Sequence, residues 1–211
     1  MPHSLATLIG GNAIGMAFRA GMERGYIVVV EELHHNLLRI FAETLVYFVV
    51  FDAYFYAGHR LFHTKYLWLI HRPHHRSKTP NALAGTSFHP IEGVLFGMFL
   101  PCYATILTHC LGGIPKGTLV VCGALQFLQS IAIHSGLDAT PAWWFEHPIL
   151  SKLLTPTFHD RHHECPNCNY AGFFTWLDDF FGTADQHWRS KYASWKRHGR
   201  NYRTVSTRKK E

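Results

Sequence analysis

The chain has 211 residues, enough for one domain with a sizeable core but too few for two comfortable ones. Hydrophobic residues make up 47% of it and charged residues only 16%, below the roughly 25% that is typical of soluble domains. The net charge is +6, but no nucleic-acid-binding motif accompanies it, and a membrane surface with anionic headgroups explains the basic clusters more simply. The composition therefore favours a membrane protein over a nucleic-acid-binding one. Five cysteines, an odd number placed mostly in apolar stretches, argue against a secreted disulfide framework.

The N-terminal segment, residues 1–38, contains a short apolar and glycine-rich stretch at 5–18. It lacks the basic start and the clear cleavage site of a signal peptide. We expect either a weak membrane helix or a helix that lies at the interface.

Three later stretches have the length and composition of membrane helices: residues 40–59, 93–113 and 118–134. About 20 apolar residues are needed to cross a hydrocarbon core of ~30 Å, and the first stretch is interrupted only by Glu43 and Asp52. The segment GGIPKG is expected to join the second and third stretches as a helical hairpin. The alternative is that all three are buried helices of a soluble protein, since none is a perfectly uncharged run.

The histidine-rich segments all fall on one side of this arrangement. The first span ends at His59, and the hairpin leaves near His89 and returns at His134. Lys and Arg gather on the same side, including the basic tail at 188–211, and such an excess marks the cytoplasmic face. We expect a multi-pass integral membrane protein whose histidines and tail face the cytoplasm.

The histidines recur at spacings that put them on one face of a helix. His59 and His63 are four residues apart, and an i, i+3, i+4 spacing occurs twice. The two trios are His71, His74, His75 and His159, His162, His163. Imidazole suits Fe, Zn, Cu and Ni, and eight such histidines, with His134 and His89 nearby, exceed the four ligands of a structural zinc site. The pattern predicts two metal ions. The remaining histidines are expected to be structural: His3, His34, His35, His109, His147, His187 and His198.

Several motifs taken together resemble a known family. They are GHRLFHTKYLWLIHRPHH at 58–75, HPIE at 89–92, HSGLD at 134–138 and HDRHHECPNCNYAGFFTWLDDFFGT at 159–183. In order and spacing they are similar to the fatty acid hydroxylase and sterol desaturase superfamily of membrane-bound di-iron oxygenases, over roughly residues 45 to 187. The run NCNYA also resembles the cholesterol 25-hydroxylase branch. The C-x-x-C within the last motif has no second C-x-x-C, so a turn is expected there.

The resemblance implies an all-α fold, an integral membrane bundle of three to four helices with a cytosolic helical cap that carries the metals. It implies a catalytic domain at 39–187 with two non-haem Fe ions. The implied ligands are His59, His63, His71, His74, His75, His89, His134, His159, His162 and His163. HPIE could instead cap the helix that follows, because Pro suits an early helical position.

Polar residues near the histidines are candidates to orient them. Asp52 lies seven residues before His59 on the same helical face and is costly at that membrane depth without a role. Asn169 could be a ligand or a hydrogen-bond donor, so Asp52 and Asn169 are the candidate catalytic residues beside the metals. Asp138, Asp160 and Asp178 are further candidates, and each has the alternative of a solvated or capping group.

The resemblance implies an oxidoreductase that uses O2 to hydroxylate an unactivated C–H bond of a lipid: a fatty acyl chain, a sphingolipid or a sterol. Desaturation of a lipid by the same site is the alternative. Since the chain contains no flavin, nicotinamide or haem motif, the electrons would come from a separate donor, cytochrome b5 or ferredoxin with its reductase. A histidine-rich metal transporter would spread its ligands through the bilayer, and a non-catalytic family member would keep the fold without the reaction.

Overall fold

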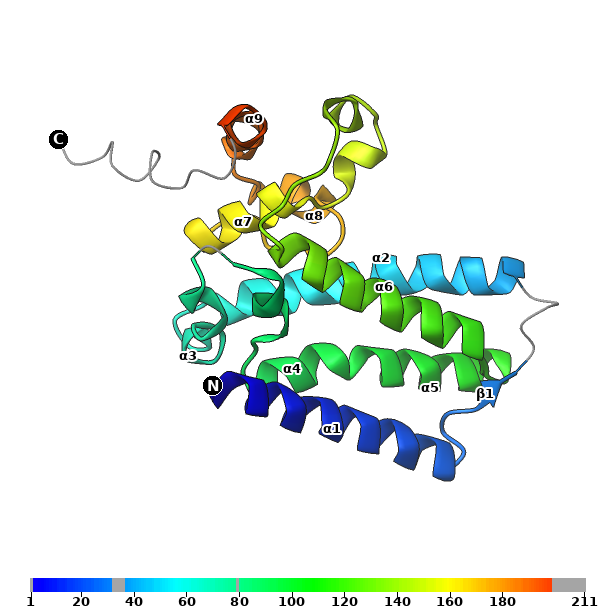
Figure 1. Cartoon of the computed structure of the whole chain (residues 1–211). Helices are drawn as coiled ribbons and strands as arrows, with labels where there is room; N and C mark the ends of the chain where they lie inside the picture. The colour runs from blue at the N-terminus through cyan, green and yellow to red at the C-terminus, as the bar shows by residue number, and fades with distance from the viewer. Residues whose placement is uncertain (1, 32–36, 79, 199–211) are drawn as a thin grey trace.

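Four long helical stretches run side by side and alternate in direction (Figure 1). They are α1 (Pro2–Glu23), α2 (Leu37–Phe62), the consecutive pair α4 (Pro90–Gly97) and α5 (Phe99–Leu111), and α6 (Lys116–His134). The structure is a computed structural model and describes residues 2–31, 37–78 and 80–198. His34, His35 and the tail from residue 199 onward lie outside the described residues, as do the side chains of His3 and His198. The predicted all-α helical bundle is confirmed.

Three stretches are long and apolar enough to cross a membrane: Leu37–Phe62, Pro90–Leu111 and Lys116–His134. Large apolar side chains are exposed along them, among them Leu45 (53%), Val120 (61%) and Leu128 (58%). Exposed apolar surface of this extent is unfavourable in water but suits contact with lipid. The chain is therefore a membrane protein with the three predicted spans.

The second span is not continuous, because it contains Pro101 near its middle. Proline has no N–H to donate to the carbonyl of Gly97, and its ring crowds that carbonyl. The helix is consequently interrupted between α4 and α5, and Cys102 N–H resumes the pattern by donating to Met98 O at 3.1 Å. The sequence had predicted one unbroken helix over 93–113.

The predicted hairpin turn also forms a small piece of sheet. Helix α5 ends at Gly112, whose φ of 77° is in the left-handed region that favours glycine. After Gly113, the strand β2 (Ile114–Pro115) pairs in parallel with β1 (Val29–Val30), which follows α1. This pairing ties the N-terminal segment to the hairpin.

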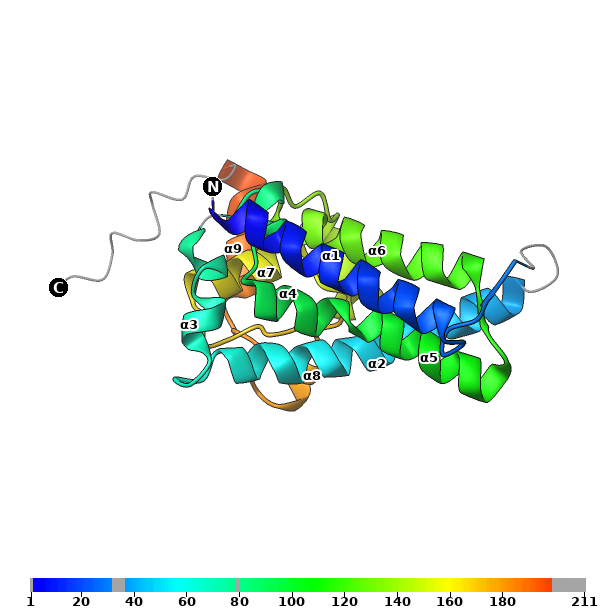
Figure 2. The same ribbon diagram turned by 90° about the horizontal axis from the view of Figure 1, so that it is seen from below.

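Helix α1 lies along α4 and α5 (Figure 2), on the side of the bundle away from α7 to α9 (Figure 1). Gly97 allows this approach, since a Cβ added there would lie 2.1 Å from Ile14 Cδ1. Helix α1 is not among the described helices that are apolar enough to span. Whether it crosses the membrane or lies at the interface stays a prediction.

The rest of the chain forms a cap of short elements at the end of the bundle where α2 and α6 finish (Figure 1). We define the cap as residues 63–89 and 135–198. Its elements are α3 (Trp68–His71), η1 (His74–Arg76), η2 (Ala82–Thr86), η3 (Ala142–Phe145), η4 (Leu150–Lys152), α7 (Pro156–Glu164), α8 (Trp176–Phe180) and α9 (Trp188–His198). The helical cap was predicted from the sequence.

An aromatic core holds the spans together. Tyr47 on α2 stacks on Phe51 at 5.7 Å between ring centroids and meets Tyr103 on α5 edge-on at 5.2 Å. Glu43, one of the two acidic residues in the first span, is buried and accepts hydrogen bonds from Arg39 (2.6 Å) and Thr118 (2.8 Å). Its charge is therefore paired within the bundle, as polar groups in membrane spans must be.

Candidate metal centre

Nine of the ten predicted histidine ligands gather into two groups, in which the ring nitrogens all lie within 4.8 Å of one another. The first group is His59, His63, His71, His75 and His162, and the second group is His74, His134, His159 and His163. No other cluster of this kind occurs among the described residues.

The spacing of the nitrogens fits metal ligation. In the first group the Nε2 atoms of His59 and His75 lie 3.1 and 2.9 Å from that of His71. In the second group, Nε2 of His134 lies 3.2 Å from that of His74 and 3.0 Å from that of His159. Two nitrogens bound to one ion at about 2.1 Å and about 90° apart are separated by about 3.0 Å. Each group therefore has the convergence expected around a single ion.

The two trios are divided between the groups. Although His159, His162 and His163 share one face of α7, His162 points into the first group while the other two enter the second. The trio at 71–75 divides in the same way, because His71 and His75 join the first group and His74 joins the second. The two groups consequently lie side by side, with the rings of His75 and His163 4.8 Å apart.

Burial keeps the imidazoles uncharged. The pKa of His63 is lowered to about 2, first by burial and then by the neighbouring His59 and His163. Burial likewise holds the pKa values of His159 and His162 well below the usual 6.5, and the adjacent histidines add to the effect. The neutral ring is the form that binds a metal, so these histidines can act as ligands without first losing a proton.

Hydrogen bonds at the opposite ring nitrogen orient four of the ligands. His59 Nδ1 donates to the carbonyl of Tyr170 at 2.8 Å, and His134 Nδ1 donates to that of Ser130 at 2.7 Å. His162 Nδ1 donates to Cys168 O at 2.6 Å. A proton fixed on Nδ1 leaves Nε2 free to face the metal.

The fourth such partner is Glu92, whose role the sequence analysis missed. Its Oε1 lies 2.7 Å from His71 Nδ1, and both side chains are almost fully buried. Glu92 ends the HPIE motif in the first turn of α4. An acidic residue beside an apolar stretch was the available signal, and the same argument had drawn attention to Asp52 within the first span.

His89 lies outside both groups. It is the N-cap residue of α4, where its Nδ1 accepts a hydrogen bond from Ile91 N–H at 3.3 Å and Pro90 follows. This is the capping role that the sequence left open as the alternative. His109 and His147 also lie apart from the groups and bond to nearby backbone instead.

Asp52, predicted to lie beside the metals, belongs to neither histidine group and instead holds a cap loop. Its Oδ1 accepts from the N–H groups of Gly172, Phe173 and Phe174, at 3.2, 2.8 and 3.2 Å. Its Oδ2 accepts from Trp176 Nε1 at 3.0 Å. The buried carboxylate in the first span therefore fixes the segment at 172–176, within the last motif and after its histidines.

Asn169 and Asp178 fix the same region from the other side. Asn169 has a φ of 59°. Its side-chain Nδ2 donates to Phe158 O, and its Oδ1 accepts from Asp185 N–H, so both polar atoms of the amide are used. Asp178 accepts from the N–H groups of Tyr170 (2.9 Å) and Ala171 (2.8 Å). Both residues thus position the backbone around Tyr170, whose carbonyl accepts the hydrogen bond from His59 Nδ1.

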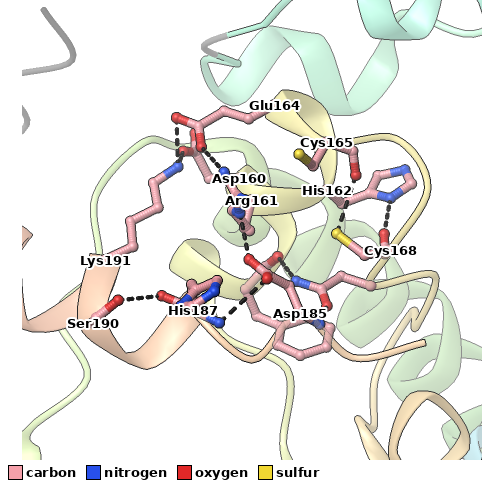
Figure 3. Close-up of polar contacts among 12 residues, drawn as sticks. Asp160, Arg161, His162, Glu164, Cys165, Cys168, Asp185, His187, Ser190 and Lys191 are labelled. Atoms are coloured by element: carbon pink, nitrogen blue, oxygen red, sulfur yellow. Dashed lines mark hydrogen bonds and ion pairs between the residues drawn. The ribbon is translucent and has the colours of Figure 1, made fainter. Parts of the chain in front are cut away.

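The outer face of α7 is tied to α9 by ion pairs (Figure 3). Arg161 pairs with Asp185 and Glu164, and Lys191 on α9 pairs with Asp160 and Glu164. Asp138 accepts from Thr157 N–H at 3.1 Å and so holds the start of α7.

The predicted turn at CPNC is present and directly follows α7. Both of its cysteines are free thiols. Its contribution to the metal centre is the Cys168 carbonyl that His162 contacts (Figure 3).

A cavity of about 370 Å³ runs from the metal centre into the bundle. Histidines of both groups line it: His59, His71, His74, His134 and His159. Phenylalanines contribute to its walls, among them Phe51 and Phe55 from α2, Phe96 from α4 and Phe127 from α6. We call it the metal cavity. A long apolar molecule fits such walls, because apolar pockets favour ligands with little polar surface.

The fold and the site define a helical membrane protein with a candidate two-metal histidine centre. The chain belongs to the fatty acid hydroxylase family, whose family model matches residues 44–183. A very-long-chain aldehyde decarbonylase of Oryza sativa subsp. indica is 34% identical over 166 residues, covering 77% of this chain and 59% of that protein. Methylsterol monooxygenase 2-2 of Arabidopsis thaliana is 32% identical over 154 residues, covering 71% and 55%. A putative methylsterol monooxygenase of Dictyostelium discoideum is 34% identical over 146 residues, covering 68% and 51%.

The chain spans only about half to six tenths of the length of these relatives. No solved structure matches it. The family resemblance predicted from the motifs is confirmed, whereas the narrower likeness to cholesterol 25-hydroxylases stays a prediction.

Proposed function

We propose that this chain is a membrane-bound di-iron oxygenase that hydroxylates an unactivated C–H bond of a lipid with O2 and external electrons. The observation that carries the proposal is that two all-histidine groups lie side by side and both contribute histidines to the lining of one apolar cavity. The family match and the relatives named as methylsterol monooxygenases support a lipid substrate.

The residues present fit two iron ions. The first group would hold one ion and the second group the other, with nitrogen ligands only. When bound, the irons would supply the activation of O2, which no amino-acid side chain provides.

The chain itself contributes orientation and exclusion of water. Glu92 and the Tyr170, Ser130 and Cys168 carbonyls keep the Nδ1 protons in place. The aromatic walls of the metal cavity would align an extended apolar chain and keep water from the reacting carbon.

The remaining partners are also part of the proposal. We propose that the cap faces the cytoplasm, because Arg72, Arg76 and Lys78 are exposed on it and basic residues favour that side. A separate donor, cytochrome b5 or ferredoxin with its reductase, would deliver the electrons there. The clustering of all nine histidines at one end of the bundle favours an enzyme over a metal transporter, which would distribute ligands through the bilayer.

The test compares the lipids of cells that express the wild type or His162→Ala, each with an electron donor present. His187→Ala is the matched control, since His187 lies outside both histidine groups. A lipid that gains one oxygen in the wild type and the control, but not in His162→Ala, supports hydroxylation and identifies the substrate. A lipid that loses two hydrogens supports the desaturase alternative. Identical lipids in all three, from protein that contains its iron and is supplied with a working donor, would overturn the proposal.

A further inference from the structure

A second apolar cavity opens on the outside of the bundle between α2 and α6. It has a volume of about 510 Å³ and is roofed by the cap. Its walls are Phe41, Thr44, Leu45 and Phe48 from α2, Leu125, Leu128, Gln129 and Ala132 from α6, and Leu153, Phe173 and Phe174 from the cap. We call this cavity the lateral groove.

The rim of the lateral groove has the character of a lipid-facing surface. Phe41 is 66% exposed, and Leu45 and Leu128 are more than half exposed. All three belong to the two helices that are long and apolar enough to span the membrane. Acyl chains of the bilayer are therefore the molecules that surround this rim, and no polar headgroup needs to be buried for a chain to enter it.

The lateral groove and the metal cavity share two wall residues, Gln129 and Phe173. The Phe173 ring packs against Phe48, a wall of the lateral groove, with ring centroids 4.5 Å apart. It also packs against Phe51, a wall of the metal cavity, at 5.8 Å. The Phe173 ring therefore separates the lateral groove from the metal cavity.

The backbone of Phe173 is fixed while its side chain is not pinned by any polar contact. Its N–H donates to Asp52 Oδ1 at 2.8 Å, and its carbonyl accepts from Leu154 N–H at 2.8 Å. A change of the Phe173 side-chain rotamer would connect the two cavities without moving the loop. The buried carboxylate of Asp52 would then hold the Phe173 backbone in place while the ring moves.

We infer that the lipid enters sideways from the bilayer, with its acyl chain passing through the lateral groove into the metal cavity and the Phe173 ring acting as the gate. This inference rests on the proposed function, because it takes the substrate to be a membrane lipid. It assigns a substrate route to the space between α2 and α6 and a gating role to one residue.

The test uses the full chain in lipid nanodiscs and a long-chain fatty acid that carries a photoreactive diazirine in mid-chain. After illumination, mass spectrometry locates the labelled residues, and labels on the buried side chains of Phe51 or Phe96 report on the metal cavity. The blocking variant is Ala132→Trp, which fills the lateral groove without altering a wall of the metal cavity. The control is Ala124→Trp, also an exposed alanine of α6 that lines neither cavity.

We expect Ala132→Trp to slow labelling of the metal cavity by about tenfold or more, since a blocked route lowers the association rate. Ala124→Trp should label like the wild type, and Phe173→Ala should label faster. Equal labelling rates in Ala132→Trp and the wild type would overturn the lateral route, and unchanged labelling in Phe173→Ala would overturn the gate. A wild type whose cavity is not labelled at all would instead overturn the lipid assignment on which the route rests.

Discussion

Glu92 Oε1 lies 2.7 Å from His71 Nδ1, and the two side chains are 1% and 2% exposed. The contact joins the first turn of α4 to the first group of histidines. Because the carboxylate fixes the Nδ1 proton, it directs Nε2 of His71 toward His59 and His75. A single buried acidic residue therefore orients one of the central ligands of the candidate metal centre.

The first prediction concerns this contact. Replacing Glu92 by Ala should lower the affinity of the first group for metal by about 10- to 100-fold, because the orienting partner is lost. Equilibrium dialysis followed by metal analysis of the purified protein measures this. His89→Ala is the control from the same helix end: it removes the N-cap of α4 and should cost about 1 kcal/mol of stability while leaving metal content unchanged. Equal metal loss in both variants would contradict the role of Glu92.

The second prediction concerns Gly85 in η2. A Cβ there would lie 2.6 Å from Ser130 O and 3.0 Å from His134 Nδ1, which are themselves hydrogen-bonded. Gly85→Ala should therefore displace His134 and reduce the metal bound by about one ion per chain, through the second group. Gly93→Ala meets no atom within 4 Å and should keep both ions. Full metal content in Gly85→Ala would refute the prediction.

The third prediction separates structural from catalytic use of Asp52. Its carboxylate accepts four hydrogen bonds that hold the loop at 172–176. Asp52→Ala leaves those donors without a partner and should destabilise the fold by at least about 2 kcal/mol. Asp179→Ala removes only an exposed ion pair with Lys152 and should cost less than about 1 kcal/mol. Thermal unfolding in detergent compares them, and similar unfolding temperatures would show that the loop does not depend on Asp52.

The fourth prediction is a loss of stability of the metal-free protein as the pH falls. Burial lowers the pKa of His63 to about 2 and holds those of His159 and His162 well below 6.5. Below about pH 6.5 these histidines bind protons in the unfolded chain but stay neutral in the folded cluster. Each of them therefore favours unfolding increasingly as the pH decreases. Above that pH the contribution is constant. Chemical unfolding of the metal-free protein between pH 5 and 8 should show a steep decline on the acid side, and His187→Ala should leave the slope unchanged.

The positions of the spans and the types of ligand could be predicted from the amino-acid sequence. Hydrophobic runs of membrane length follow from the thickness of the bilayer, which is why the helices at Leu37–Phe62 and Lys116–His134 were predicted close to their observed bounds. Helical spacing also identified the trios at 71–75 and 159–163, because residues three and four apart must share a helix face. The interruption of the second span followed from Pro101, a signal that was present in the sequence but not used.

How these parts combine depends on the packing of elements that are far apart in the sequence. Spacing places His159, His162 and His163 on one face, but the division of that face between two groups depends on where α2, α6 and the segment at 71–75 meet it. The hydrogen-bond partners of the polar residues could not be predicted from local sequence patterns either. Asp52 bonds to residues more than 100 positions away, and Glu92 rather than His89 reaches a ligand because α4 starts beside His71. Local sequence fixes which residues share a helix face, whereas the packing of distant helices determines what each face meets.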